Sequence, residues 1–164
     1  MQAPVINKSW IGKPIAFRES KGLPGLGLKA PMHLNFNLTA LRAGPLPGLR
    51  GFVAAAAIDG GCDIGGPRFP GAALPGYNHV YNCHDIAEWQ HARVKIYVDG
   101  ELGAESPTLQ SQGLEWVFNI SLAASAAVLR VVAMPAEVLD PDYGSALAGQ
   151  QNAYDWVDLI GGFV

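Results

Sequence analysis

Histidine and cysteine side chains form the one cluster of soft metal ligands in the sequence. It holds His79, Cys83, His84 and His91, with Cys62 upstream. Structural zinc sites usually take ligand pairs roughly two to four residues apart at both ends of the site, whereas this chain has no CxxC pair. We therefore interpret the cluster as loop and edge-strand histidines beside a buried cysteine, and we predict no metal and no cofactor. A disulfide between Cys62 and Cys83 stays open, although no export signal supports it.

Carboxylates recur in close pairs, which are candidates for acid–base chemistry on sugars or for calcium binding. The pairs are Asp59 with Asp63, Asp85 with Glu88, Asp140 with Asp142, and Asp155 with Asp158. Pro141 lies inside one pair and the bidentate glutamate of an EF-hand is missing, which excludes that loop. Acidic residues in such places usually form turns and caps. Because the G-x-S-x-G motif is also absent, we predict no catalytic residue and no enzymatic activity.

Aromatic side chains could form a platform on which sugar rings stack. The candidates are Trp10, Trp89, Trp116, Trp156, Tyr77, Tyr81 and Tyr143. Trp116 alternates with apolar residues and is expected in the core, whereas Trp89 and Trp156 remain open. Aromatic residues near 77–81, together with Trp89, therefore support carbohydrate binding as an alternative function.

The elements that must position these residues are clearest in residues 94–134. Apolar and polar residues alternate over 94–98, which is the period of a half-buried strand, and Asp99-Gly100 predicts a hairpin turn because both accept positive φ. Residues 116–122 repeat the alternation, and residues 128–134 are almost continuously apolar, as in a covered strand. The pattern predicts three strands of one sheet. The expected core residues are Val94, Ile96, Val98, Trp116, Phe118, Ile120 and Val131.

Earlier segments add further strands to this prediction. Residues 32–39 alternate cleanly, with Leu34, Phe36 and Leu38 toward a core and polar residues toward water or a neighbouring subunit. Residues 52–58 predict a buried strand, although four alanines favour a helix. Residues 22–28 carry leucines separated by Gly and Pro, so we expect no regular element there.

Two segments carry large apolar side chains without an evident core to bury them. One is the Gly/Pro-rich loop 60–76, and the other is the tail after Ala153, which we expect to dock on its own domain or on a neighbour. The interface candidates are Ile64, Phe69 and Leu74 in the loop and Trp156, Leu159, Ile160 and Phe163 in the tail. On this interpretation, truncation after Asn152 spares the fold and weakens assembly.

Length and composition limit the class of protein. The 164 residues fit one domain, 1–164, with an extended N-terminal segment, and 20 glycines and 12 prolines predict long loops. The 11 basic residues are scattered in a chain of net charge −3, so we expect no nucleic-acid partner. Apolar runs shorter than a membrane span and the lack of a signal peptide predict neither a membrane partner nor export. The fold class is all-β, an antiparallel sandwich of immunoglobulin-like or jelly-roll-like type.

Residues 94–134 resemble the last strands of bacterial immunoglobulin-like domains, with a strand, an Asp-Gly turn, a Trp-x-Phe-x-Ile-x-Leu strand and a final strand. The likeness departs at residues 123–127, where that family usually has a glycine-containing turn. It implies a domain of the kind found in cell-surface proteins and in phage tails and capsid decoration. We therefore expect a non-enzymatic structural subunit of a phage-like virion, with copies of itself and other subunits as partners. The expected location is the virion, or otherwise the cytoplasm; a carbohydrate-binding module is the alternative function.

Overall fold

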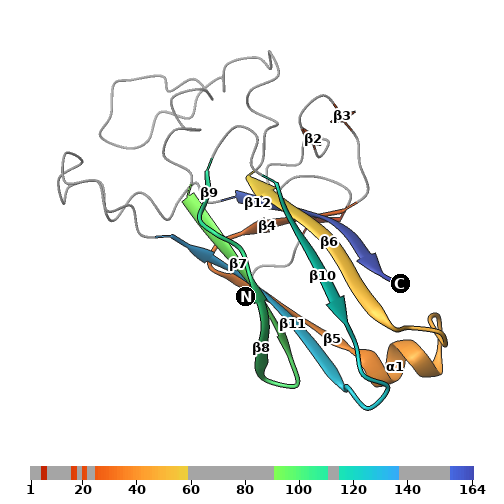
Figure 1. Cartoon of the computed structure of the whole chain (residues 1–164). Coiled ribbons are helices and arrows are strands. Elements are labelled where there is room, and N and C mark those ends of the chain that lie inside the picture. Colours follow the sequence, from red (N-terminus) through yellow and green to blue (C-terminus); the bar gives the residue numbers. More distant parts are fainter. Residues whose placement is uncertain are drawn as a thin grey trace, which may run out of the picture.

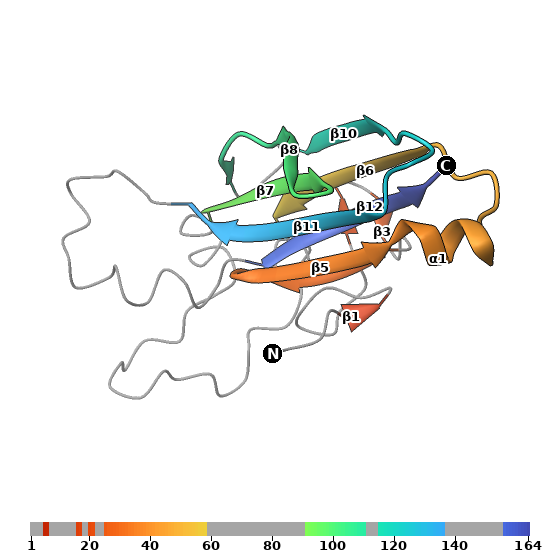
Figure 2. The ribbon, with the colours of Figure 1, turned by 90° about the horizontal axis from the view of Figure 1, so that it is seen from below.

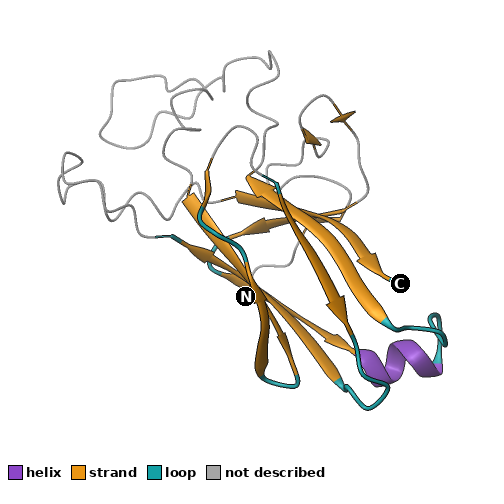
Figure 3. Cartoon of the chain, viewed as in Figure 1, coloured by secondary structure: helices purple, strands orange, loops and turns teal. Residues whose placement is uncertain are grey.

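The protein is described by a computed structural model covering residues 5–6, 16–17, 20–21, 25–58, 91–110, 115–136 and 156–164. These residues are mostly strands, joined by turns and loops, with one short helix among them (Figures 1 and 3). The elements are β1 (Val5–Ile6), β2 (Ala16–Phe17), β3 (Ser20–Lys21), β4 (Gly25–Lys29), β5 (Met32–Asn37), α1 (Leu38–Ala43), β6 (Gly51–Ile58), β7 (His91–Val98), β8 (Glu101–Glu105), β9 (Leu109–Gln110), β10 (Trp116–Ser121), β11 (Val128–Pro135) and β12 (Trp156–Phe163).

Two sheets face each other and form a sandwich (Figure 2). One, which we call the five-stranded sheet, has the order β1-β4-β12-β6-β10. The other has the order β5-β11-β7-β8, and the two-residue strand β9 also pairs with β7; we call it the four-stranded sheet after its four ordered strands. Every pairing described between these strands is antiparallel. The all-β antiparallel sandwich expected from the alternating sequence is therefore confirmed.

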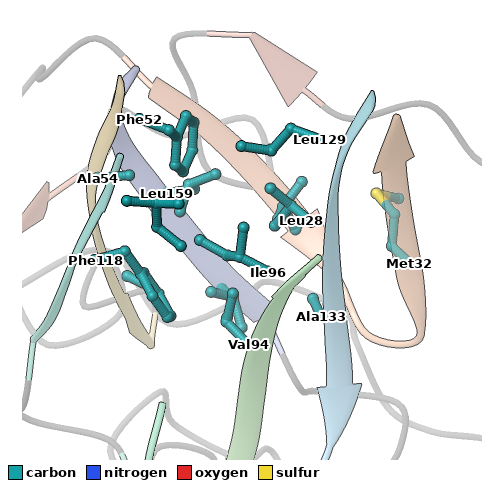
Figure 4. Close-up of a cluster of buried hydrophobic side chains, with 14 of the residues drawn as sticks. Leu28, Met32, Phe52, Ala54, Val94, Ile96, Phe118, Leu129, Ala133 and Leu159 are labelled. Carbon is teal, nitrogen blue, oxygen red and sulfur yellow. The ribbon is translucent and has the colours of Figure 1, made fainter. Parts of the chain in front are cut away.

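The core lies between the sheets and takes apolar side chains from β4, β5 and β6, from β7, and from β10, β11 and β12 (Figure 4). Val94, Ile96 and Val131 are fully buried on the four-stranded side, opposite Phe118 and Ile120 of the other sheet. Leu34, Phe36 and Val98 are partly buried and pack against this cluster. Because side chains alternate along a strand, each buried row leaves a second row on the outside of its sheet.

The hairpin predicted at Asp99-Gly100 joins β7 to β8. Asp99 has φ of 51° and Gly100 has φ of 91°, as a tight hairpin turn requires. The prediction of three neighbouring strands in one sheet is wrong for β10, which pairs with β6 in the opposite sheet, whereas β11 returns to pair with β7. Residues 122–127 therefore connect one layer to the other.

Side chains from other elements hold this connection in place. The Arg42 guanidinium donates hydrogen bonds to the carbonyls of Ala123, Ala124 and Ala126. The Asp99 carboxylate accepts from the backbone N–H groups of Ala127, at 2.9 Å, and Val128, at 2.8 Å. These distant partners satisfy the backbone of a loop that lacks glycine.

A helix interrupts the alternation predicted over residues 32–39. The strand β5 ends at Asn37, whose side chain accepts a hydrogen bond from the backbone N–H of Ala40 at 2.8 Å and so caps α1. Leu38 nevertheless reaches the core and is fully buried, as expected. The burial prediction holds at a residue whose secondary structure was predicted wrongly.

Residues 22–28 were expected to be irregular, and for 25–28 this is wrong. Leu26 and Leu28 of β4 point toward the core, while Gly25 and Gly27 alternate with them. The strand is held by pairing with β12 on one side and β1 on the other. Tertiary pairing thus overrides the low strand propensity of glycine.

The apolar tail forms β12, a central strand between β4 and β6. Of the two expectations for it, docking on its own domain is the one observed. Gly161 has φ of 115°, and a Cβ there would lie 2.3 Å from the carbonyl oxygen of Val53, so only glycine fits this close approach. Because truncation after Asn152 removes the middle strand of this sheet, we now expect it to disrupt the fold rather than to spare it.

Candidate functional site

The outward-pointing side chains of the four-stranded sheet form the surface that we call the outer face. In register order, its main positions are His33 and Asn35 of β5, Arg130 and Val132 of β11, Arg93, Lys95 and Tyr97 of β7, and Leu102 and Glu105 of β8. Neighbouring strands lie about 4.8 Å apart, and alternate residues of one strand about 7 Å apart. Long side chains from several strands can therefore contact one ligand.

One row across this face runs Asn35, Arg130, Tyr97 and Leu102, each directly opposite the next. The Arg130 Nε donates a hydrogen bond to the Asn35 Oδ1 at 2.8 Å. This bond fixes the plane of the guanidinium group, and its two terminal nitrogens make no hydrogen bond or ion pair within the described residues. Arg130 is thus an oriented donor beside a tyrosine ring.

The next row carries an ion-pair network. The Glu105 carboxylate lies 3.4 Å from the Lys95 Nζ and 3.6 Å from an Arg93 terminal nitrogen. Arg93 also donates through Nε to the Thr108 Oγ1 at 3.1 Å. One carboxylate therefore neutralises part of the charge of two cations, while Arg130 stands outside the network.

The outer face has the groups needed to bind a polar ring. A phenol offers a flat apolar surface with little conformational entropy to lose. Guanidinium and amide groups donate to, or accept from, hydroxyl groups at fixed angles. Tyr97, Arg130 and Asn35 combine these properties within one row, which suits a sugar ring better than an extended apolar ligand.

Trp116 was expected in the core, but it is 41% exposed. It starts β10, which is the edge strand of its sheet and, among the described strands, pairs with β6 alone, with Trp116 opposite the small Ala56. An edge strand has no neighbour on its second side to cover a large ring. Trp116 is therefore a second exposed aromatic side chain, apart from the outer face.

An apolar pocket of about 230 Å³ lies beyond the far end of β12. It is lined by residues 45–49 of the loop after α1, together with Phe163 and Val164. No charged side chain lines it, so it lacks the convergent polar groups that usually fix a small ligand.

The structure accounts for the described tail residues within one chain. Leu159 is 4% exposed in the core, and Ile160 packs beside Ala57 on the outside of the five-stranded sheet. The Phe163 ring lies edge-on to two other rings, with its centroid 5.1 Å from that of Phe36 and 5.2 Å from that of Phe52. Trp156 begins β12. The contacts with a second molecule expected for these residues stay a prediction.

Several sequence candidates lie outside the described residues. They are Ile64, Phe69 and Leu74 of the loop, the residues Cys62, His79, Cys83 and His84, the aromatic residues Trp10, Tyr77, Tyr81, Trp89 and Tyr143, and, of the four carboxylate pairs, every member except Asp158. Within the part of the chain that is described, no group of three or more His, Cys, Asp or Glu side chains could hold a metal ion. The same part contains no helix long and apolar enough to cross a bilayer.

No protein-family model matches the chain, and a search of curated proteins gives no match. Solved structures do resemble it. The CBM51 of Clostridium perfringens GH95, in complex with methyl-galactose, has a TM-score of 0.64 at 12% identity, with 100% of this chain and 89% of that chain covered. This likeness extends over nearly the whole of both chains and shows a shared β-sandwich fold.

Two further CBM51 structures cover 99% of this chain. For CBM51-2 in complex with GlcNAc and the INT domains of Clostridium perfringens ZmpB, the TM-score is 0.62 at 16% identity, and the match spans 28% of that chain. For the tandem CBM51 modules of Sp3GH98 from Streptococcus pneumoniae, the TM-score is 0.57 at 9% identity, and the match spans 40% of that chain. This chain therefore spans less than half the length of these two larger chains.

These neighbours correct two hypotheses drawn from the sequence. The bacterial β-sandwich is retained, but its neighbours are carbohydrate-binding CBM51 modules rather than immunoglobulin-like domains of the phage type. The hypothesis of a phage structural subunit, with its virion and capsid setting, is therefore wrong, and carbohydrate binding is the better supported alternative. The resemblance of residues 94–134 to immunoglobulin-like domains did not identify the function, because alternating strands with Asp-Gly turns occur in many unrelated sandwiches.

The sequence missed the outer face as a site. Part of the face could be read from the sequence, because two predicted strands each have a row of polar residues. His33 and Asn35 lie in the polar row of one, and Lys95 and Tyr97 lie in the polar row of the other. The register that sets Arg130 between Asn35 and Tyr97 joins residues far apart in the chain. Sequence spacing alone does not contain that register.

Proposed function

We propose that this chain is a non-catalytic carbohydrate-binding module whose sugar site is the outer face. The observation that carries the proposal is the likeness, over 99–100% of the chain, to CBM51 modules, of which one is in complex with GlcNAc and another with methyl-galactose. Because that likeness bears on fold, the choice of site rests on the chemistry of the outer face.

Tyr97 supplies the stacking surface in this proposal. The apolar CH face of a pyranose ring lies on the phenol, and hydroxyl groups at the ring edge bond to Arg130 and Asn35, its neighbours in the same row. The row is built on paired strands, so it is rigid before the ligand binds and loses little entropy on binding.

A glycan array followed by calorimetry tests the proposal, with methyl-galactose and GlcNAc as the first soluble ligands. We expect binding to at least one glycan and its loss in Tyr97→Ala, with an unchanged melting temperature. Val117→Ala is the matched control, because this exposed side chain lies on the other sheet. Absence of binding to every glycan overturns the function.

Trp116→Ala distinguishes between two sites for the same function. Retained binding in this variant, with loss in Tyr97→Ala, supports the outer face. Loss in Trp116→Ala with full binding in Tyr97→Ala would move the sugar to the β10 edge and overturn the assignment to the outer face.

A further inference from the structure

Arg130 is the cation of the outer face that has no carboxylate partner among the described residues. Arg93 and Lys95 share Glu105, whereas the Arg130 Nε is bonded to a neutral amide, Asn35 Oδ1, at 2.8 Å. The residue is exposed. Its two terminal nitrogens are therefore available as a planar fork, the geometry that matches a carboxylate or sulfate group.

The charge of this face differs in sign from that of the chain. Among the described residues, three cations, Arg93, Lys95 and Arg130, gather on it with one carboxylate, Glu105. The whole chain has 11 basic and 14 acidic residues, a net charge of −3. A locally positive surface on a negative protein selects ligands by charge at short range, since exposed charges act over about 10 Å at ordinary ionic strength.

We infer that the outer face binds glycans that carry an anionic group, a carboxylate or a sulfate ester, and that Arg130 binds this group. The inference rests on the proposed carbohydrate-binding function and names its ligand class. Tyr97 lies directly opposite Arg130 in the register, so a sugar ring stacked on the phenol places a substituent of its edge over the guanidinium fork.

The second row assists the same ligand. Lys95 is diagonal to Arg130, since Tyr97 pairs with Arg130 and Lys95 with Val132, and diagonal neighbours lie about 7–8 Å apart. Lys95 is held by Glu105, so it contributes less than Arg130. Removing the Glu105 charge frees Lys95 and Arg93 and strengthens the attraction for an anionic glycan.

A nucleic acid is the competing anionic ligand and is less well matched to this face. Nucleic-acid surfaces concentrate many cations along a groove to contact successive phosphates. Here two of the three cations are paired with a carboxylate on the same face. Single-stranded DNA is therefore one of the probes in the test.

The test compares three glycan polymers by calorimetry or affinity electrophoresis with the full chain: a neutral galactan, a polygalacturonate carrying carboxylates, and a sulfated galactan. Single-stranded DNA is the fourth probe. We expect one or both acidic polymers to bind at least about tenfold tighter than the neutral one, because hydrogen bonds to charged groups are the stronger ones. The preference should shrink as salt is raised. The two acidic polymers distinguish a carboxylate from a sulfate as the bound group.

Variants identify the residue. Arg130→Gln should lower affinity for the acidic polymer about tenfold or more and remove the preference, whereas Arg130→Lys, which keeps charge without the fork, should be intermediate. Arg50→Gln is the matched control, an exposed arginine outside the four-stranded sheet. Glu105→Gln should raise the affinity for the acidic polymer. Melting temperatures of all four variants verify folding.

Each outcome decides one of the two proposals. Equal binding of neutral and acidic polymers, or a preference that survives Arg130→Gln, overturns the anionic-ligand inference and leaves the carbohydrate-binding function standing. Binding of single-stranded DNA as tight as that of the acidic glycans also overturns the inference, because it indicates a general cationic surface. Binding of no glycan at all overturns both.

Discussion

The two outward sides of the sandwich are built from different residues. On the five-stranded sheet, Gly27, Asp158 and Ala57 stand in one row, and all three are buried. On the four-stranded sheet, the corresponding outward row holds exposed Asn35 and Arg130 beside a partly buried Tyr97. Short, buried side chains permit close packing on the first side, while long polar side chains leave the second side open to a ligand. Changes at buried positions of the five-stranded sheet should therefore affect stability, and changes on the outer face should affect binding.

Removal of β12 by truncation after Asn152 should have the largest effect. The strand separates β4 from β6, and it contributes Val157 and Leu159 to the core. Its loss leaves two unpaired strand edges inside a sheet, with their backbone groups unsatisfied. We expect no cooperative thermal transition by circular dichroism. A cooperative melt near that of the full chain would contradict the central position of β12.

Phe118→Ala in β10 should cost about 3–5 kcal/mol of unfolding free energy, as for other large aromatic side chains in cores. Phe118 is 1% exposed, whereas its neighbour Val117 is 58% exposed. Val117→Ala should change stability by less than about 0.5 kcal/mol. Denaturant titration of both variants measures the difference. Equal losses of unfolding free energy would contradict the assignment of Phe118 to the buried row of β10 and Val117 to the exposed row.

Gly161→Ala should destabilise the protein by about 2–4 kcal/mol, from backbone strain and from the close contact that its Cβ makes with β6. The new atom would lie 2.3 Å from the Val53 carbonyl oxygen at a φ of 115°. Gly162→Ala is the adjacent control, because no atom lies within 4 Å of its Cβ position. Similar melting temperatures for the two variants would refute the close approach of β12 to β6.

Asp99→Ala should cost about 1–2 kcal/mol, since two backbone N–H groups lose their acceptor. Asp99→Asn keeps an acceptor oxygen and tolerates positive φ, so its loss should be well under half as large. Urea titration distinguishes the two. An equal loss would mean that charge, rather than the hydrogen-bond acceptor, holds residues 127–128.

Tyr97→Ala and Arg130→Gln should have the smallest effect on stability, below about 1 kcal/mol, because both residues lie outside the buried core. Their effect on glycan binding should be large. A melting temperature lowered as far as in Phe118→Ala would assign these residues to structural packing and remove the contrast between the two sides of the sandwich.

The sequence by itself determined the parts of the fold that are written in local patterns. Alternation identified β5, β7 and β10, and Asp99-Gly100 identified the β7–β8 hairpin. Burial of Val94, Ile96 and Phe118 followed from the same alternation, because a strand in a sandwich must turn one row of side chains toward the core.

Only the tertiary structure decided which strands are neighbours. Gly25–Lys29 became a strand through pairing with β12, and Trp116 became exposed because β10 lies at a sheet edge. Arg130 gained its place between Asn35 and Tyr97 from a register between distant segments. Hydrophobic periodicity specifies the face of the strand on which a residue lies. The residues beside it on neighbouring strands are selected by pairing energies summed over the whole sheet. The proposed site could not be predicted from the sequence because it is made of residues from different strands.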